Sequence, residues 1–281
     1  MRIITDSAAD FTNEELQAYD IDCVRTQVMF GDKSYTPGVD LSEKEFWDKL
    51  MVGENAKTSQ PSPEAFLQVF ERIKELGEEA IYICVSSSLS GTMQGARLAA
   101  SMLNYDKLHI VDSLNGAAGQ KLLVMYACRL RDEGKTLAGE MIEKLNDVKK
   151  RIRLFASLDT LDNLARSGRI SKTVASIGSL AKIKPLLTVS DDGHIIMAGK
   201  ALGRHRAIDS LAKRIATFEI DREHPILPLY SYDDGNCCAL IEKLKALGVQ
   251  INEELKCAIG TAIAPHIGPG AYGATFVVAK E

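Results

Sequence analysis

The chain has 281 residues, of which 46% are hydrophobic and 26% are charged, and its formal net charge at pH 7 is −4. These values are those of an ordinary globular protein, and the length is sufficient for two domains. A net negative charge without a block of basic residues argues against nucleic-acid binding. The N-terminus enters a predicted strand directly, and no apolar run approaches the ~20 residues of a membrane span. We therefore expect a cytoplasmic protein.

The first half of the chain alternates strand and helix signals. Apolar runs predict strands at residues 2–5, 23–30, 80–85 and 108–111, and amphipathic segments between them predict helices. Hydroxyl residues mark the helix starts: Thr12 with Glu15 and Ser42 with Glu45 form capping boxes, and Ser62 precedes Pro63. Such alternation is typical of a parallel sheet with helices on both faces. We predict a Rossmann-like α/β domain over residues 1–150.

The pattern changes beyond a charge-rich segment at residues 144–153. Residues 185–189 and 194–198, joined by Ser-Asp-Asp-Gly, predict a β-hairpin. Hairpins mixed with helices indicate an α+β domain with a mixed sheet, which we place at residues 151–281. The other predicted elements of this half are helices at 204–218 and 237–247, a strand at 225–232 and two strands within 257–278.

The cysteine pattern indicates neither a redox motif nor a metal site. No Cys-x-x-Cys spacing occurs, and the adjacent Cys237 and Cys238 have no partner at the spacing of zinc ligands. Mostly apolar surroundings favour small buried side chains. No Walker lysine motif is present, so we expect no ATP chemistry, no metal and no cofactor. The six cysteines are Cys23, Cys84, Cys128, Cys237, Cys238 and Cys257.

The most informative segment is Val85–Thr92, which reads Val-Ser-Ser-Ser-Leu-Ser-Gly-Thr. It places five hydroxyl side chains in the turn between a buried strand and a helix, where ligands of open α/β sheets bind. Hydroxyls and free N–H groups at a helix start suit an anionic oxygen. A structural role needs only one of them, because Ser88 or Ser90 alone would cap the helix. We therefore predict that this turn faces a ligand.

Two further clusters are candidates for the same site. Thr58 and Ser59 precede the helix that begins at Pro63, and their hydroxyls suit the same ligand site as the turn at residues 85–92. A plain polar loop explains them equally well. His266 lies among three glycines, which let the backbone approach a ligand, and its imidazole can donate to an anion or transfer a proton. A structural histidine is the alternative.

Charged residues at two other places are also considered for structural roles. Asp6 and Asp112 follow predicted strands, and we favour a role in capping helices or holding loops over catalysis. Arg166 and Arg169 flank Gly168, which is predicted to end a helical turn. Guanidinium groups suit a carboxylate or a phosphate, but an arginine near a helix C-terminus also satisfies carbonyl groups.

The residues alone leave the kind of function open. A binding protein for a sugar or a phosphate would use the Ser-Gly turn at the helix start. A Ser-dependent esterase or acyl-transfer enzyme would use Ser90 and His266, although the Gly-x-Ser-x-Gly motif is absent. Turnover of activated acyl esters would identify the enzyme, whereas stabilisation by phosphorylated metabolites would identify the metabolite-binding protein.

Six motifs, taken in order, resemble the DegV family of bacterial fatty-acid-binding proteins. They span nearly the whole chain, and the ordered set is specific although each motif is weak alone. The motifs are Ile4–Ser7, Lys57–Pro61, Ser87–Thr92, Leu164–Ile170 with its Ser-Gly-Arg, Ile183–Pro185 and His266–Gly270.

The resemblance implies two α/β domains that enclose one long-chain fatty acid, with the carboxylate between the domains and the acyl chain in an apolar tunnel. It also implies a carrier and not a catalyst. Some members of the family present the acid to a separate ATP-bound fatty acid kinase, which makes acyl phosphate for phospholipid synthesis. By motif, the residues near the carboxylate are Thr58, Ser59, Ser90, the N–H of Gly91, His266 as a hydrogen-bonding partner, and Arg169, which orders the domain interface.

One position departs from the family pattern. After the predicted hairpin the family has Gly-Lys-x-Arg, whose arginine is tied to the kinase partner, whereas this chain has Gly-Lys-Ala-Leu-Gly-Arg at residues 199–204. Leu202 occupies the arginine position. The resemblance therefore supports lipid binding more strongly than kinase coupling, unless Arg204 or Arg206 substitutes for the missing arginine.

Overall fold

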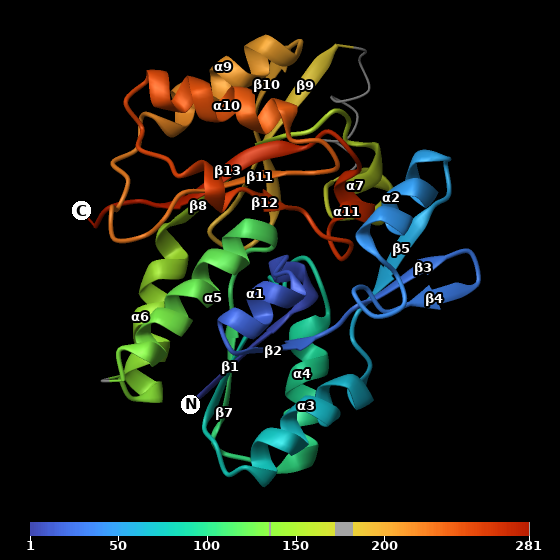
Figure 1. Ribbon diagram of the computed structural model, residues 1–281, viewed down its shortest axis with the longest axis vertical. Coiled ribbons are helices and arrows are strands. Elements are labelled where there is room, and N and C mark those ends of the chain that lie inside the picture. The colour runs from blue at the N-terminus through green and yellow to red at the C-terminus, as the bar shows by residue number, and fades with distance from the viewer. Residues whose placement is uncertain (135, 172–181, 281) are drawn as a thin grey trace. The chain divides into compact units, whose positions relative to one another are not determined.

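The computed structural model describes residues 1–134, 136–171 and 182–280, and the chain divides into two compact units. Unit 1 consists of Met1–Lys150 and Gly260–Ala262, and unit 2 consists of Arg151–Ile259 and Ile263–Glu281. Each unit has its own sheets and its own buried hydrophobic core. Figure 1 labels their helices and strands.

A parallel four-stranded sheet forms the centre of unit 1, with the strand order β2-β1-β6-β7. The run Ala-Ile-Tyr-Ile-Cys of β6 is buried at every position, as expected for a central strand that is covered on both faces. This sheet and the helices between its strands confirm the α/β class predicted for the N-terminal half. The strands are β1 (Arg2–Asp6), β2 (Ile21–Val24), β6 (Ala80–Cys84) and β7 (Leu108–Asp112).

Side-chain caps define the starts of three helices in unit 1. Thr12 and Ser42 form the predicted capping boxes, and Ser62 accepts a hydrogen bond from the N–H three residues later. The capped helices are α1 (Asn13–Ala18), α2 (Glu43–Met51) and α3 (Pro63–Glu75). By contrast, α4 (Thr92–Leu103) and α5 (Ala117–Asp132) begin after glycines without a side-chain cap. Unit 1 also contains η1 (Ser7–Ala9), and α6 (Ala138–Arg151) leads into unit 2.

The predicted strand at residues 23–30 is wrong as a single element, because the strand is interrupted at residues 25 and 26 between β2 and β3, which belong to different sheets. Thr26 ties this break to η1: its N–H donates to Ser7 Oγ at 3.0 Å, and the two hydroxyls lie 2.7 Å apart. Two polar segments form strands because they pair with β3, including the Thr58–Ser59 segment, for which a loop was the alternative. The resulting antiparallel sheet has the order β4-β3-β5, with β3 (Gln27–Phe30), β4 (Lys33–Tyr35) and β5 (Ala56–Ser59).

Aromatic side chains join α3 and α4 to the parallel sheet. Phe66, Phe70 and Tyr82 are fully buried, and their ring centroids lie 5.8–5.9 Å apart. Gly95 of α4 lies against this group, because a Cβ there would come within 3.1 Å of the Phe66 ring. The close packing of the two helices fixes the position of the α4 start within unit 1.

Unit 2 is built on a mixed six-stranded sheet with the order β10-β9-β8-β13-β11-β12, which confirms the predicted sheet type. β9 and β10 form the predicted antiparallel hairpin, with an irregularity between Met197 and Gly199. Among the described strands of this six-stranded sheet, only β11 and β12 pair in parallel. The strands are β8 (Ile152–Ser157), β9 (Ile183–Val189), β10 (Ile195–Leu202), β11 (Leu227–Tyr230), β12 (Cys257–Ala258) and β13 (Tyr272–Val277).

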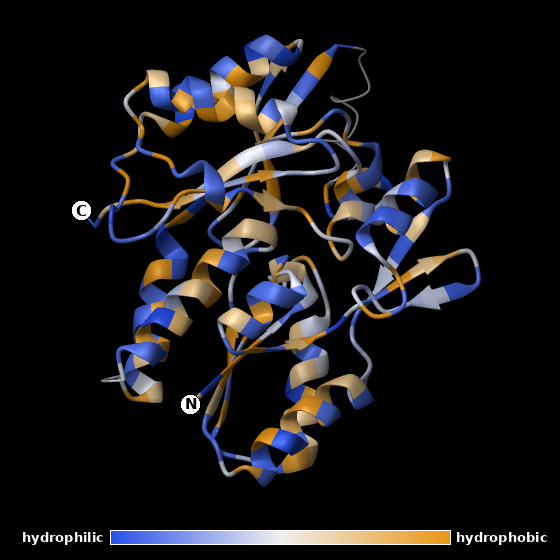
Figure 2. Ribbon diagram, viewed as in Figure 1, coloured by the Kyte–Doolittle hydropathy of each residue, from blue (hydrophilic) through white to orange (hydrophobic). Residues whose placement is uncertain are grey.

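Two helices, α9 (Arg204–Ile215) and α10 (Gly235–Ala246), pack together against this sheet (Figure 1). Their buried residues Leu211 and Leu240 belong to one core cluster with Phe276 of β13. Figure 2 shows hydrophilic and hydrophobic residues alternating along both helices, as expected when one face is buried. Shorter elements of unit 2 are α7 (Asp162–Ser167), η2 (Glu253–Leu255) and α11 (Ala264–Ile267).

Candidate functional site

The hydroxyl-rich turn between β6 and α4 lies at the carboxyl edge of the parallel sheet, and hydrogen bonds hold its backbone. The N–H of Ser86 donates to Asn115 O at 2.7 Å, and the N–H of Ser87 donates to the Asp112 carboxylate at 3.3 Å. The N–H of Ser90 donates back to Ser86 O at 3.1 Å. The turn is therefore preformed by contacts with the segment that follows β7.

Several of the five hydroxyls serve the turn itself. Ser86 and Thr92 are fully buried, and Ser86 Oγ accepts the Ser88 N–H at 3.2 Å. Ser90 Oγ lies 2.8 Å from Thr92 Oγ1 and accepts the Thr92 N–H at 3.3 Å. The N-cap position is Gly91, so the predicted cap at Ser88 or Ser90 is wrong. The half-buried Ser90 stands directly before this uncapped helix start.

The start of α4 has the properties of an anion-binding position. The N-cap residue Gly91 provides no side-chain cap, and although Ser90 Oγ accepts the Thr92 N–H, the first turn of this 12-residue helix carries positive partial charge. Gly91 is exposed, and a Cβ there would overlap Oε1 of Gln60. The residue that follows β5 thus lies against the start of α4.

Thr58 and Ser59 are on β5, an edge strand of the small sheet, and not in a loop. Both are half-buried, and their Cα atoms pair with those of Val28 and Gln27 on β3. Because Gln60 contacts the Gly91 position, the segment that carries both hydroxyls reaches the start of α4. Their role in binding a ligand stays a prediction.

In unit 2, His266 lies on α11, which packs against α7. Burial and, to a smaller extent, the charge of Arg169 lower the pKa of His266 from 6.5 to about 4. The imidazole is therefore neutral at pH 7 and offers one N–H donor beside a guanidinium group. Gly168 ends α7 with a φ of +73°, as predicted, and Arg169 donates to the carbonyl of Ser167. Arg169 thus has the helix-terminal contact that the sequence offered as its structural role.

The glycines that follow His266 let two segments of unit 2 approach each other. Gly268 and Gly270 have φ values of +72° and +82°, and Cβ atoms there would overlap the side chains of Asn163 and Asp159. Ser231 holds the turn: its Oγ donates to Gly268 O at 2.8 Å and accepts a backbone N–H at 2.9 Å. The glycines are therefore explained by contact with the protein's own chain.

The acidic residues at the strand ends hold loops, which confirms the structural role we favoured. Asp6 is buried and accepts hydrogen bonds from the N–H groups of Ala8 and Val85 at 3.0 and 2.9 Å and from the Tyr82 hydroxyl at 3.0 Å. Burial raises the pKa of Asp6, and these hydrogen bonds oppose the rise. Asp112 accepts the Ser87 N–H from the hydroxyl-rich turn.

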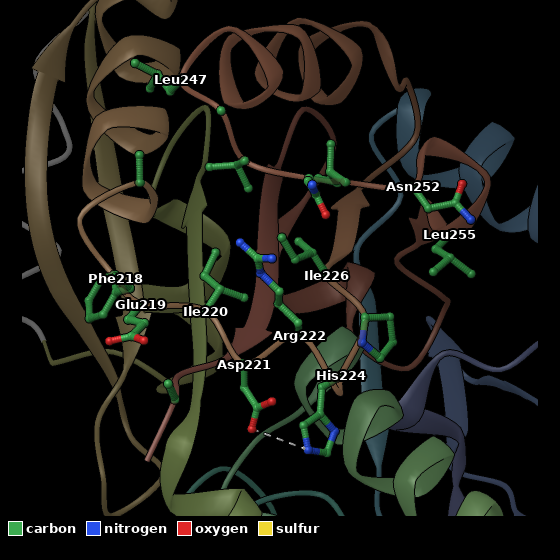
Figure 3. Close-up of a pocket in the computed structure, with 17 residues that line it drawn as sticks. Phe218, Glu219, Ile220, Asp221, Arg222, His224, Ile226, Leu247, Asn252 and Leu255 are labelled. Atoms are coloured by element: carbon green, nitrogen blue, oxygen red, sulfur yellow. Dashed lines mark ion pairs between the residues drawn. The ribbon is translucent and has the colours of Figure 1, made fainter. Parts of the chain in front are cut away.

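A pocket of about 1070 Å³ lies in unit 2 between residues 216–226 and residues 247–255. Figure 3 shows Arg222 directed into it and His224 paired with Asp221, at 4.0 Å. The described residues that line it include none of those singled out from the sequence. Sequence patterns did not predict this pocket, because its walls come from separate segments of the chain.

The cysteine prediction holds for four thiols and is wrong for two. Cys23 and Cys238 are half-buried, whereas the other four are buried, and all six are free. Across residues 1–134, 136–171 and 182–280, no three His, Cys, Asp or Glu side chains group as a metal site. In the same segments no helix combines the length and apolar character needed to span a membrane.

Known proteins match this chain over nearly its full length. The family model described as "Uncharacterised protein, DegV family" matches residues 1–279. A DegV domain-containing protein of Clostridium acetobutylicum is 34% identical over 282 residues, which cover 99% of this chain and 98% of the relative. A second, from Caldanaerobacter subterraneus, is 31% identical over 274 residues, with coverages of 98% and 97%.

Solved structures share the fold. A stearic-acid-binding protein from Eubacterium ventriosum has a TM-score of 0.89 at 25% identity, with 99% of this chain and 98% of that chain covered. A DegV family protein from Thermus thermophilus, described by its fatty acid binding, has a TM-score of 0.87 at 29% identity, with coverages of 99% and 100%. DegV from Bacillus subtilis, described as a fatty acid binding protein, has a TM-score of 0.83 at 27% identity, with 99% of both chains covered.

Proposed function

The chain belongs to the DegV family, and from this premise we propose that it binds one long-chain fatty acid and acts as a carrier. Fatty-acid-binding proteins with the same fold, at 25–29% identity, support the proposal. The observation that carries it in this chain is the start of α4, where an uncapped Gly91 stands beside Ser90 and against the segment of Thr58.

We propose that the carboxylate is held in unit 1 by the hydroxyls of Thr58, Ser59 and Ser90 and by the N–H of Gly91. Neutral donors suit this task, because hydrogen bonds to the charged form offset the loss of hydration and keep the acid ionised. The uncapped helix start adds a favourable partial charge. Together these groups specify which end of the lipid they receive.

We propose that His266 and Arg169 of unit 2 serve the same carboxylate. The neutral imidazole would donate one hydrogen bond, and the guanidinium would supply the positive charge that the unit 1 groups lack. The acyl chain would occupy an apolar tunnel, and each buried CH₂ contributes about 0.8 kcal/mol. The length of the acyl chain then dominates the affinity, whereas the polar residues set the orientation of the lipid.

The first test is lipid extraction under denaturing conditions followed by mass spectrometry of the purified protein. We expect close to one equivalent of a C14–C18 fatty acid per chain. A Thr58→Ala/Ser90→Ala variant should lose most of it, whereas Ser87→Ala, which changes an exposed hydroxyl of the same turn, should retain it. A protein that is empty and takes up no added fatty acid contradicts the proposal.

Titration with a radiolabelled fatty acid resolves the contributions of the two units. Removing one hydrogen bond to a charged group costs about 1.5–3 kcal/mol, or roughly tenfold to a hundredfold in affinity. We expect this loss for Ser90→Ala and for His266→Gln separately. A double-mutant cycle should show coupling between the two changes if they serve one carboxylate. Strictly additive losses contradict a shared carboxylate while leaving fatty acid binding intact.

The carrier proposal excludes catalysis by the chain itself. A Ser-dependent esterase would hydrolyse activated acyl esters and would lose that activity in Ser90→Ala. We expect no turnover of p-nitrophenyl esters above the rate given by the Ser90→Ala variant. Ser90-dependent turnover would instead support the enzyme.

Presentation of the lipid to an ATP-dependent fatty acid kinase is the finer part of the proposal. Leu202, where the family pattern has arginine, is 57% exposed at the end of β10, and Arg204 begins α9 two residues later. We expect Leu202→Arg to increase acyl phosphate formation by an added fatty acid kinase, while fatty acid affinity stays unchanged. No acyl phosphate with either form contradicts kinase coupling.

A further inference from the structure

A half-buried thiol in the first turn of α10 lies between two charged side chains. Cys238 Sγ is 3.4 Å from the Lys256 ammonium and 3.5 Å from the Asp234 carboxylate, to which the thiol donates. Lys256 also pairs with Asp234. We call Asp234, Cys238 and Lys256 the thiol cluster. All three belong to unit 2, and Lys256 reaches the helix from the segment just before β12.

Reagents can reach the thiol cluster from solvent. The side chains of Lys256 and Asp234 are 27% and 43% exposed, and Cys238 is itself half-buried. Its neighbour Cys237 differs, because it is fully buried and burial raises the pKa of its thiol to about 12. The vicinal pair therefore contains one protected sulfur and one accessible sulfur.

We infer that Cys238 is a site of reversible modification by low-molecular-weight disulfides. In this reaction the Cys238 thiolate attacks one sulfur of R–S–S–R, a new sulfur–sulfur bond forms, and R–S⁻ leaves. The released thiolate takes up the proton that Cys238 lost, and the disulfide is the only oxidant required. A thiol such as R–SH reverses the modification by the same exchange.

The geometry favours the attacking thiolate in two ways. The Lys256 ammonium is within contact distance of the sulfur, so it stabilises the negative charge that appears when the proton leaves. The sulfur also lies in the first turn of a 12-residue helix, whose N–H groups carry positive partial charge. Asp234 opposes both effects, because it accepts the thiol proton and shares the lysine. Its removal should therefore increase reactivity.

The chain supplies its own control thiol. Cys23 is the other half-buried cysteine, but burial raises its pKa to about 12; the charge of Arg25 opposes this rise, and the carboxylates of Asp6 and Asp22 add to it. Cys23 is therefore a control for a thiol that burial keeps protonated. We expect Cys238 to react well before Cys23.

In the experiment, separate samples of the reduced full-length protein are treated at pH 7 with 5,5′-dithiobis(2-nitrobenzoate) or with oxidised glutathione. Peptide mass spectrometry then locates the modified residue. We expect one fast equivalent at Cys238. The isosteric Cys238→Ser should abolish the fast phase, and Cys23→Ser should leave it unchanged. A fast phase that persists in Cys238→Ser, or that maps to another cysteine, overturns the inference.

Two lysine variants test the electrostatic cause. Lys256→Met removes the cation beside the sulfur. We therefore expect the reaction at pH 7 to slow several-fold. Lys245→Met is the matched control, because Lys245 pairs with Glu253 and does not contact the thiol. Asp234→Asn should react faster than the unmodified chain. Equal rates in Lys256→Met and Lys245→Met contradict the role assigned to Lys256.

Discussion

The two units carry different polar groups at the positions that the sequence singled out. At the start of α4, unit 1 offers neutral hydroxyls and backbone N–H groups around Gly91, and none of these titrates near neutral pH. In unit 2, His266 is neutral but stands beside the charged Arg169, and its charge changes at about pH 4. Acid therefore distinguishes the two sets of residues. It adds a charge to His266 in unit 2, whereas the hydroxyls and N–H groups around Gly91 in unit 1 keep their charge.

The largest expected effect belongs to unit 1 and has the opposite sign from that of His266. Burial raises the pKa of Asp10 from 3.8 to about 8, and the Gly260 N–H and Lys121 offset only part of this rise. Since the folded-state pKa lies above the unfolded value, the contribution to stability is fully present below about pH 4. It is lost as pH rises through about 8 and amounts to on the order of 6 kcal/mol.

Asp10→Asn tests this contribution. The variant keeps the shape of the side chain, and asparagine tolerates the φ of +55° found at this position. Denaturant unfolding at pH 5 and pH 8 should show Asp10→Asn gaining stability relative to the unmodified chain at the higher pH. Asp32→Asn, in an exposed hairpin turn, is the control. Parallel pH profiles for Asp10→Asn and the unmodified chain would falsify this account of Asp10.

The second effect is a loss of stability in acid that His266 of unit 2 causes. The pKa of His266 is lowered from 6.5 to about 4 in the folded chain, so its contribution to stability is present above pH 6.5 and is lost as pH falls through 4. The loss is on the order of 3 kcal/mol. His266→Gln should flatten this acid dependence in denaturant unfolding, whereas His194→Gln, at an exposed position in the β9–β10 turn, should not. An unchanged acid slope in His266→Gln would show that another group is responsible.

A third prediction asks whether bound ligand changes unit 2. A carboxylate beside His266 would oppose the charge of Arg169 and raise the pKa of the imidazole by about one unit or more. Titration of the imidazole by NMR, with and without a saturating long-chain fatty acid, measures the change. An unaltered His266 titration in a protein that carries the lipid means that the carboxylate is held by unit 1 alone.

Local sequence signals predicted much of this fold. Thr12, Ser42 and Ser62 mark helix starts because a cap is a contact between residues three positions apart. The break between β2 and β3 was missed because Thr26 is held by Ser7, a contact across 19 positions. The polar β5 likewise becomes a strand only through its pairing with β3. Patterns within a segment do not contain such partners.

In the candidate site, too, local features could be predicted from the sequence, and features that depend on distant contacts could not. The hydroxyl-rich turn was visible because its residues are adjacent, but the burial of Ser86 and Thr92 was not, since it depends on packing. The glycines after His266 were expected to approach a ligand, yet they approach the protein's own Asn163 and Asp159. The pairing of Cys238 with Lys256 joins residues 18 positions apart and gave no signal in the sequence.

The smallest effect separates the two serines that stand before α3 and α4. Ser62 caps α3, so Ser62→Ala should cost about 1 kcal/mol of unfolding free energy. Ser90 does not occupy the cap position of α4, although its Oγ contacts the N–H and the hydroxyl of Thr92, and we expect Ser90→Ala to weaken fatty acid binding. Ser62→Ala should leave that binding unchanged. Denaturant unfolding and fatty acid titration of both variants at pH 7 compare their effects on stability and on binding. If Ser90→Ala instead destabilises the chain as much as Ser62→Ala and binds lipid normally, the hydroxyl serves the helix, and the carboxylate must be held elsewhere.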